Sequence, residues 1–545
     1  MKRMLEKRMT PLHWSALAAS LAIVVALFGW LWLRHHLEPI ARQRIVETLE
    51  AKLHCEVELD EVHLSLAHGP AVNGRGLRIM DIGSHARRTP GGTPMLVVRS
   101  FQFASTFSDL VLHSSSAITA YAQGLVMTIP PADDRTTIAQ GDPKKRNQPR
   151  NSLFLNKLVA TDSRLVLESS KPGKPPVVFN FKEFVLEDPG KNDPFVFDAV
   201  LVNPKPIGDV HTTGHIGPWV FDNSRQSPVD ANFTFDHADL STIKDLTGTL
   251  SSSGRLTGTL GQMFVHGVVD ISDFALNLSA HAFPVHAEYQ ARVDGADGDV
   301  ALDDVSAHFL HTSLNGNGLI SRTEKVPGHD INLDVHLREG RAEDLLTLLS
   351  KAPRPLLTGA IRLQGHLEVP PGVQPFALKL RAKGTAAIAG ITWSNPEVQQ
   401  QVDQLSLRAQ DVGKAKQAIQ DPAASPRVDS AMSGAFVIEH GDIDIGGLVY
   451  KAPGATLLMD GRYPLLAREL DFHGVARTIA PASHLETGIK SLLLKPVSPF
   501  LKKHGAGMQL PVSFTGDKAH PHFALDLMHD KAEPESAMAA KGKPL

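Results

Sequence analysis

The stretch GTLGQMFVHGVVDISDFALNLSA, which runs from Gly258 to Ala280, carries the pattern that decides the fold. Apolar and polar residues alternate, the phase slips, and the alternation resumes. Alternation with a period of two predicts β-strands with one apolar face, and a slip predicts a turn or a bulge. Together with the residue two places upstream, the apolar positions form three sets: Leu256, Gly258 and Leu260; Met263, Val265, Gly267, Val269 and Ile271; Phe274, Leu276 and Leu278.

The same pattern fills most of the chain up to about residue 340 and returns further on. Examples are SRLVLES, PVVFNFKEFVLED, FVFDAVLV and HAEYQARVDG. Turns that contain Gly, Pro or Asn-Gly separate the runs, and most linkers are too short for a crossover helix. The sequence therefore predicts a mainly β protein with antiparallel strands.

Each one-sided strand needs a cover for its apolar face. Because convincing helices are few, the cover is a second sheet, a sheet that closes on itself, or an apolar ligand in a curled trough. The aliphatic lining suits acyl chains, but it also suits an ordinary core, and the pattern alone favours self-packed sheets. The residues predicted to line a lipid groove are Leu256, Leu260, Val265, Val269, Ile271, Phe274, Leu276 and Leu278.

The N-terminus predicts a membrane anchor. The run from Trp14 to Leu33 has twenty residues without a charge, and at about 1.5 Å per residue it spans roughly 30 Å, the thickness of a bilayer's hydrocarbon core. Lysines and arginines precede it, which places the N-terminus in the cytoplasm. A cleaved signal peptide is the alternative, but no small-residue cleavage site follows. The anchor residues are Trp14, Leu21, Val25, Phe28, Trp30, Trp32 and Leu33.

Two segments have helical spacing. Leu37 to Cys55 places Ile45 and Leu49 on one side, and Arg341 to Pro353 carries a leucine-rich face. Two polar stretches, 131–152 and 411–430, combine charge, proline and small residues, and are predicted as loops. The last segment with strand-like alternation lies near the C-terminus. It is followed by a tail of low hydrophobicity that is predicted to be disordered.

The candidate chemistry is sparse. The chain of 545 residues has a net charge of −3, which argues against nucleic-acid binding, and its one cysteine excludes a disulfide framework. Among 26 histidines, His520 and His522 are the best metal-ligand pair, but no third ligand follows at a recognised spacing. The acidic run from Asp294 to Val305 lacks a calcium-loop spacing and is predicted as a turn. We therefore expect no catalytic residues, no cofactor and no metal site.

Several segments together resemble the AsmA-like family of bacterial envelope proteins, which is related to TamB and to bridge-like lipid-transfer proteins. They are VELDEVHLSLAHGPAVNGRGLRIMD after the first helix, NPKPIGDVHTTGHIGPW, FTFDHADLSTIKDLTGTLSSSGRLTGTLGQMFVHGVVDISDF, and LKPVSPFLKKHGAGMQLPVSFTGDKAHPHFALDL. The resemblance implies an elongated curled antiparallel β-sheet groove with one N-terminal transmembrane helix and a few short amphipathic helices. It also implies a role in phospholipid transport to the outer membrane, in outer-membrane biogenesis and in homeostasis of the cell envelope.

The resemblance and the composition together predict the organisation of the chain. It begins with a cytoplasmic N-terminus at 1–13 and a transmembrane helix at 14–33. The AsmA-like part follows in three regions: an N-terminal helix and strands at 34–130, a central β-groove at 153–410, and a C-terminal β-region with helices at 431–530. Polar loops at 131–152 and 411–430 separate these regions, and a disordered tail at 531–545 ends the chain.

The leading interpretation is a single-pass protein of the inner (cytoplasmic) membrane with the bulk of its chain in the periplasm. It would hold or conduct phospholipid acyl chains in its groove and catalyse no reaction. Its partners would be the membrane, phospholipids and outer-membrane or other envelope proteins, and not nucleic acid. The alternative is a non-catalytic envelope scaffold with self-packed sheets that assists outer-membrane protein assembly. An envelope hydrolase would need a convergent polar pocket that the sequence does not supply.

Overall fold

The computed structural model describes most of the chain, in separate ranges. These are residues 38–47, 49–50, 56–65, 71–80, 94–104, 118–129, 155–168, 175–188, 193–204, 206–218, 224–279, 281–295, 297–323, 326, 328–410, 427–478, 508–518 and 520–526. The predicted anchor at Trp14–Leu33, the loop at 131–152, most of the loop at 411–430, the tail at 531–545 and Cys55 lie outside the described residues. Within the described ranges, no helix is long and apolar enough to cross a membrane.

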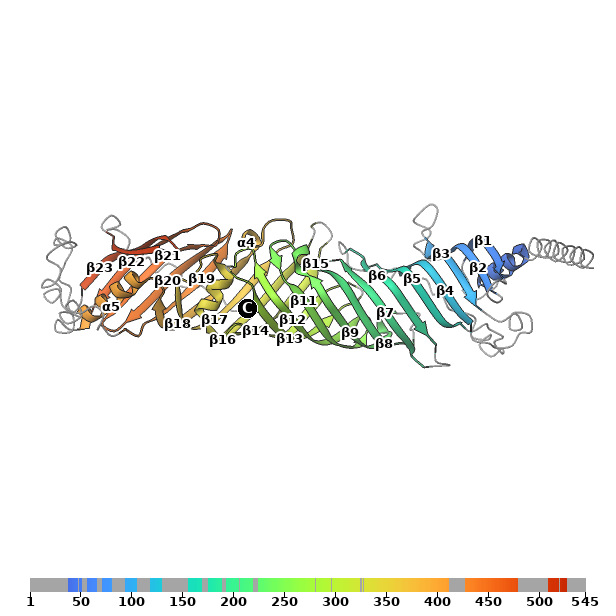
Figure 1. The fold of residues 1–545 in the computed structure, drawn as a ribbon, viewed down its shortest axis with the longest axis horizontal. Helices are drawn as coiled ribbons and strands as arrows, with labels where there is room; N and C mark the ends of the chain where they lie inside the picture. The colour runs from blue at the N-terminus through green and yellow to red at the C-terminus, as the bar shows by residue number, and fades with distance from the viewer. Residues whose placement is uncertain are drawn as a thin grey trace, which may run out of the picture.

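The described chain is mainly β, as predicted, and its strands form one open sheet of twenty-four strands. Figure 1 shows an elongated sheet in which the colour runs from blue to red along the long axis, so strands adjacent in sequence lie side by side. Each strand pairs with the next one along the chain, except that β9 pairs with β11 and the short β10 pairs with β12. This order explains the length of the molecule, because each added strand extends the sheet by about 4.8 Å.

The strand and helix bounds are as follows. The first strands are β1 (Val57–Ser65), β2 (Ala71–Met80), β3 (Pro94–Ala104), β4 (Ile118–Ile129), β5 (Leu155–Leu167), β6 (Val177–Glu187), β7 (Phe195–Pro204), β8 (Ile207–Ile216) and β9 (Pro228–Asp239). The middle strands are β10 (Leu246–Thr247), β11 (Thr249–Thr259), β12 (Gln262–Leu276), β13 (Phe283–Val293), β14 (Val300–Phe309), β15 (Thr312–Arg322), β16 (His329–Arg341), β17 (Leu357–Val369) and β18 (Arg381–Trp393). The last strands are β19 (Ala431–Glu439), β20 (Asp442–Ala452), β21 (Ala455–Pro464), β22 (Glu469–Thr478), β23 (Met508–Asp517) and β24 (His520–Leu525). The labelled helices are α3 (Ala342–Leu349), α4 (Phe376–Lys379) and α5 (Pro396–Gln410), with short 3₁₀ turns at Ser224–Gln226 and Leu240–Thr242.

One pairing departs from the antiparallel prediction. Strand β4 pairs with β5 in parallel, with Ala122 opposite Ala160, so the sheet is mixed. A parallel pair requires the chain to return to the end at which the first strand began, which takes a connection of a dozen residues or more. Residues 130–154 provide that length, because the stretch predicted as a loop falls between these two strands. All other pairings among the described strands are antiparallel.

The phase slips of the opening stretch have direct structural counterparts. Strands β11 and β12 form a hairpin in which Leu256 pairs with Val265, so the first two apolar sets share one face. The second slip is a bulge between Ile271 and Phe274, where the register of β12 against β13 shifts. The two slips are therefore a turn and a bulge, and Leu256, Val265, Ile271 and Phe274 remain on the same side of the sheet.

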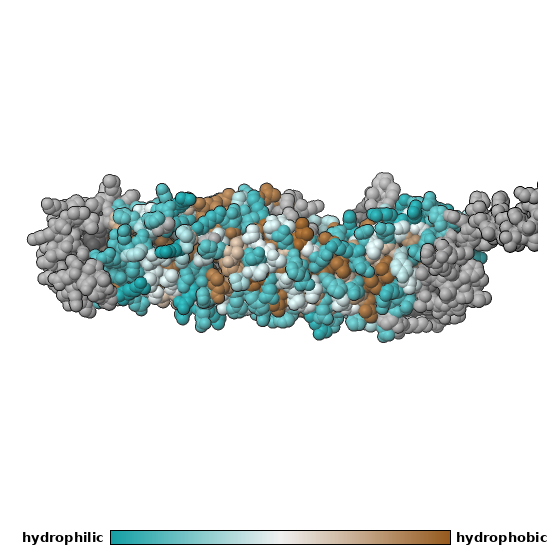
Figure 2. Space-filling model, viewed as in Figure 1, coloured by the Kyte–Doolittle hydropathy of each residue, from teal (hydrophilic) through white to brown (hydrophobic). Residues whose placement is uncertain are grey.

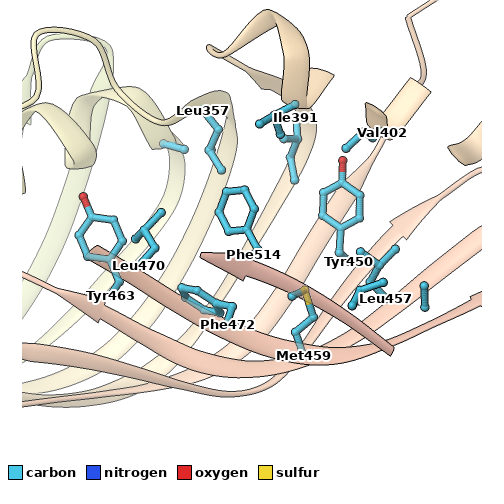
Figure 3. Packing of buried hydrophobic residues seen from close by; sticks show 14 of the residues in the cluster. Leu357, Ile391, Val402, Tyr450, Leu457, Met459, Tyr463, Leu470, Phe472 and Phe514 are labelled. Atoms are coloured by element: carbon cyan, nitrogen blue, oxygen red, sulfur yellow. The ribbon is translucent and has the colours of Figure 1, made fainter. Parts of the chain in front are cut away.

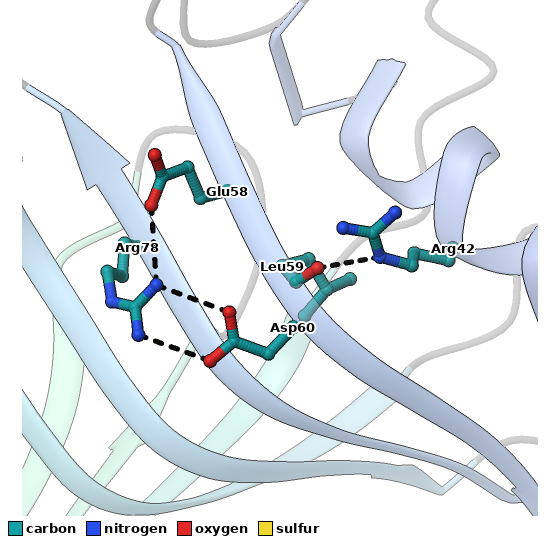
Figure 4. Close-up of polar contacts among 5 residues, drawn as sticks. All are labelled: Arg42, Glu58, Leu59, Asp60 and Arg78. Carbon is teal, nitrogen blue, oxygen red and sulfur yellow. Dashed lines mark hydrogen bonds and ion pairs between the residues drawn. The ribbon is translucent and has the colours of Figure 1, made fainter.

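A helix covers the N-terminal end of the sheet. Residues 38–47 and 49–50 are helical, which confirms the predicted helix within the described residues. Its side chains Ala41, Ile45, Val46 and Leu49 pack against the buried cluster of β1–β5. Figure 4 shows its Arg42, whose Nε donates to the carbonyl oxygen of Leu59 at 2.6 Å.

The later helices differ in how well the sequence predicted them. Helix α3 confirms the leucine-rich segment after Arg341. Residues 376–379, which the strand pattern included, form the short helix α4 instead, and the strand begins only at Arg381. Helix α5 was missed, although Asn395 accepts from the backbone N–H of Glu397 at 2.9 Å and Pro396 follows as the first helical residue. This is a common N-terminal helix signal that the sequence contains.

The C-terminal third has a packed apolar core. Figure 3 shows side chains from β17, β18, β20–β23 and α5 gathered against one another. The cluster includes Leu357, Ile391, Tyr450, Phe472 and Phe514, all buried. Helix α5 contacts β18, β21 and β24, so it covers this end of the molecule.

Candidate functional site

The central strands have two chemically different faces. In β13, buried or half-buried residues alternate with exposed ones along the whole strand. We call the side that carries Val265, Gly267 and Val269 the inner face, and residues paired across strands share it. Its members in the central section, β8–β15, are uncharged and include Gly208, Val210, Thr212, Gly214, Ile216, Val229, Ala231, Phe233, Phe235, Ala238, Leu250, Ser252, Gly254, Leu256, Gly258, Met263, Val265, Gly267, Val269, Ile271, Phe274, Phe283, Val285, Ala287, Tyr289, Ala291, Val293, Val300, Leu302, Val305, Ala307, Phe309, Thr312, Leu314, Gly316, Gly318 and Ile320.

One line of paired residues crosses the entire sheet on this face, and we call it the apolar row. In order it consists of Val62, Gly74, Phe101, Ala122, Ala160, Phe184, Ala199, Thr212, Phe233, Gly254, Gly267, Tyr289, Val305, Gly316, Val335, Gly365, Gly384, Phe436, Ile445, Gly461, Phe472, Phe514 and Phe523. None of these residues is charged and none is exposed. At about 4.8 Å per strand the row extends on the order of 100 Å.

Aromatic rings of the row lie over glycines on the neighbouring strands. A β-carbon added at Gly267 would come within 2.7 Å of the Tyr289 hydroxyl oxygen, and one at Gly384 within 2.8 Å of the Phe436 ring. Likewise, a β-carbon at Gly74 would clash with the ring of Phe101 at 2.1 Å. Because these glycines have no side chains, the rings can lie along the sheet and do not project far from the inner face.

Burial along the row separates the sheet into three parts. The first residues, including Val62 and Ala160, are buried, as are Phe472 and Phe514 near the other end. Between them the row residues of the central section are half-buried, apart from Gly267. The three clusters of buried apolar residues found in the described part of the chain are centred on β1–β5, on the C-terminal core and on the α4 region. The central inner face is thus buried only in part. Its Val229, Ala231, Phe283, Ala291 and Phe309 are buried, whereas most of its other residues are half-buried.

The predicted groove residues all lie on the described strands or in the turns beside them. Leu256, Leu260, Val265, Val269, Ile271, Phe274 and Leu276 are half-buried, and Leu278 is 8% exposed. The structure brings Leu256 and Val265 together as a direct pair. It separates the last two, because Leu276 and Leu278 join the cluster of Val369 and Ile438 instead of the central face.

Three polar groups on the inner face were not singled out from the sequence. The Tyr289 ring crosses over Gly267, towards the side chain of Ser252 on the next strand. Burial raises the pKa of Tyr289, and Ser252 opposes this with a smaller effect. The hydroxyl of Thr212 is buried and has no hydrogen-bond partner among the described residues. The period-two alternation could have identified all three residues, because each polar side chain occupies a position at which its strand otherwise carries apolar residues.

The outer face carries paired charges. Asp270 and His286 lie 2.7 Å apart on adjacent strands, and Arg255 reaches Asp230 at 2.8 Å. The guanidinium of Arg255 lowers the pKa of Asp230, chiefly through their hydrogen bond. In Figure 2 the face in view carries mainly hydrophilic residues along its length, with separate hydrophobic patches between them. At the N-terminal end, Arg78 pairs in the same way with Glu58 and Asp60 (Figure 4).

The candidate metal and calcium positions do not assemble a site in the described residues. His520 and His522 share an exposed face of β24, opposite Asp517 and Thr515. The acidic turn after β13 is held by an arginine, because the Arg225 guanidinium lies 2.5 Å from a carboxylate oxygen of Asp294. No group of three or more potential ligands occurs in the part of the chain that the structure describes.

Comparison of the chain with protein-family models, with characterised proteins and with solved structures finds no match.

Proposed function

We propose that the central section, β8–β15, holds the acyl chains of phospholipids against its inner face. The observation that carries this proposal is an uncharged inner face, most of whose residues along these strands are half-buried, beside an outer face of exposed ion pairs. Extended apolar surface that a protein does not bury itself is typical of a binding site.

The aliphatic lining gives acyl chains a physical reason to bind. Moving one methylene group from water to an apolar environment is favourable by about 0.8 kcal/mol. A chain of about sixteen carbons therefore gains on the order of 10 kcal/mol before the costs of ordering it. Gly316 leaves room for a chain, since it places no side chain on the inner face, whereas the Tyr289 ring covers Gly267.

We also propose that the sheet curls along its length, so that the inner face lines a groove. The rings of Trp393 on β18 and Phe514 on β23 have centroids 5.2 Å apart, although four strands separate β18 from β23. In a flat sheet these strands would be about 24 Å apart. A curl explains the contact and places headgroups along the open long side, where they can keep their hydration.

The proposed setting is the inner membrane, with the anchor at Trp14–Leu33 and the sheet in the periplasm. It rests on the charge-free N-terminal run and on the resemblance of the chain to AsmA-like proteins. In that setting the protein would support phospholipid transport to the outer membrane and its assembly. It would do so by sheltering acyl chains, without catalysing a reaction.

A scaffold function is the second candidate, and one observation favours it. The C-terminal third packs on itself, with Phe472, Phe514 and Ile391 buried in a common cluster. A closed core of this kind suits a structural domain that contacts other envelope proteins. If the central face were covered in the same way, the whole molecule would be such a scaffold.

Two adjacent residues of β12 provide the test. Val265 lies on the inner face, whereas Phe264 lies on the outer face and is 51% exposed. The full-length chain, Val265→Asp and Phe264→Asp are purified in the same detergent, extracted with organic solvent and assayed for lipid phosphorus. We expect Val265→Asp to lose at least half of the phospholipid bound per chain, and Phe264→Asp to retain it. Equal amounts in all three proteins would refute lipid binding on the inner face.

A further inference from the structure

Helix α3 has no exposed residue. Every one of its residues is buried or half-buried, although it includes Glu343, Asp344 and Thr347. It packs on β16 and β17, and it also contacts β12. Three strands separate β12 from β16, which corresponds to about 19 Å along a sheet. A helix about 10 Å wide therefore joins parts of the sheet that are distant in strand order.

The apolar side chains of α3 point into two different clusters. Leu345 and Leu346 pack against the C-terminal core. Leu349 packs against the cluster that contains Leu278 and Val369. The helix thus joins the C-terminal core to the cluster of the α4 region, which Leu276 and Leu278 enter from the end of β12.

Polar contacts attach α3 to the central section at both of its ends. Asp344, which is 3% exposed, accepts from the backbone N–H of His311 at 2.9 Å and from the Thr312 hydroxyl at 2.7 Å. At the other end, the Ser279 hydroxyl donates to the carbonyl oxygen of Leu348 at 3.0 Å. A buried carboxylate needs such partners to remain in place, so these bonds fix the helix in its position.

We propose that α3 is a stopper that ends the lipid-binding section and makes the groove blind at this point. The proposal rests on the proposed function and adds where a bound lipid stops. Acyl chains occupy β8–β15, do not pass α3 into the C-terminal core, and enter and leave across the open long side. The protein then holds lipids along its central section, and α3 blocks passage to the C-terminal end.

Site-specific photo-cross-linking tests this proposal in the full-length chain. The photoreactive residue p-benzoyl-phenylalanine replaces either Val285, on the central side of α3, or Leu363, on the inner face of β17 beyond it. The purified proteins are mixed with radiolabelled phosphatidylethanolamine in detergent and illuminated. We expect at least tenfold more labelled protein from position 285 than from position 363. Equal labelling at both positions would overturn the stopper, and no labelling at either would overturn the proposed function together with it.

An α3 variant gives the second measurement. Asp344→Ala removes the attachment to the β14–β15 turn and should raise labelling at position 363 several-fold, whereas Asp304→Ala, on the exposed face of β14, should leave it unchanged. Unchanged labelling in an Asp344→Ala protein that keeps its native proteolysis pattern would argue against the stopper. If that variant fails to fold, Ser279→Ala removes the single bond to Leu348 and is expected to change labelling in the same direction.

Discussion

The indole ring of Trp393 lies 5.2 Å from the phenyl ring of Phe514 and is tilted by 60° to it, although the two residues lie on β18 and β23. Trp393 also donates its indole N–H to the hydroxyl of Tyr450 at 3.1 Å. Edge-to-face aromatic contacts stabilise beyond their buried area. This pair joins parts of the sheet that are far apart along the strand order.

Removal of one of these rings should destabilise the C-terminal core. Phe514→Ala is expected to cost about 3–5 kcal/mol, because Phe514 is 8% exposed and a cavity would remain. The measurement is the urea dependence of tryptophan fluorescence. Val437→Ala, on the exposed face of β19, is the control and should change stability by less than about 0.5 kcal/mol. Equal midpoints for the two variants would show that the ring contact does not stabilise this end.

The glycines under the aromatic rings should tolerate no side chain. Gly267→Ala places a methyl group against the Tyr289 hydroxyl and should destabilise the protein by about 1–3 kcal/mol. It should also reduce lipid binding, since the displaced ring would stand up from the sheet. Gly446→Ala is the matched control, because its nearest neighbour is 4.0 Å away. If Gly446→Ala lost stability and Gly267→Ala did not, the claim that the Tyr289 ring leaves no room for a side chain at Gly267 would be contradicted.

The buried hydroxyl of Thr212 should be replaceable by a methyl group. Thr212→Val keeps the shape and removes a polar atom without a partner, so it is expected to stabilise the chain by about 1 kcal/mol. Thr213→Val, on the exposed face of the same strand, should have no comparable effect. Denaturant midpoints of the two variants check this, and destabilisation by Thr212→Val would mean that its hydroxyl has a partner in solution.

The free energy of unfolding should depend on pH because of the lowered pKa of Lys518. Burial lowers the pKa of Lys518 to about 8, although it donates to the Pro464 carbonyl and its ammonium group lies over the Tyr463 ring. Between pH 8 and the unfolded value of 10.5 the unfolded chain binds the proton and the folded chain does not, so stability should rise with pH in this window. Lys518→Met should flatten that rise, whereas Lys383→Met, on the exposed face of β18, should preserve it. An identical slope in wild type and Lys518→Met would rule out this lysine as the cause.

The sequence predicted the strands and their faces well, for a physical reason. Alternation is local, so the apolar sets that form one face of β11 and β12 could be grouped from the sequence alone. The parallel pairing of β4 with β5 could not, because the direction of a pair depends on how a long connection returns. The alternation also places Tyr289 on the inner face, but its approach to Ser252 depends on the glycine between them. Likewise, the leucine spacing predicted α3, whereas its position between β12 and β16 follows only from contacts distant in sequence.

The central claim is that acyl chains contact the inner face of β12 and not its outer face. Val265→Cys and Phe264→Cys, each combined with Cys55→Ser, are labelled with a small fluorophore and mixed with phosphatidylcholine that carries bromine on its acyl chains. Bromine quenches only a fluorophore that it touches. The account predicts at least twofold stronger quenching at position 265 than at position 264. Equal quenching at both positions, or none at position 265, would contradict it.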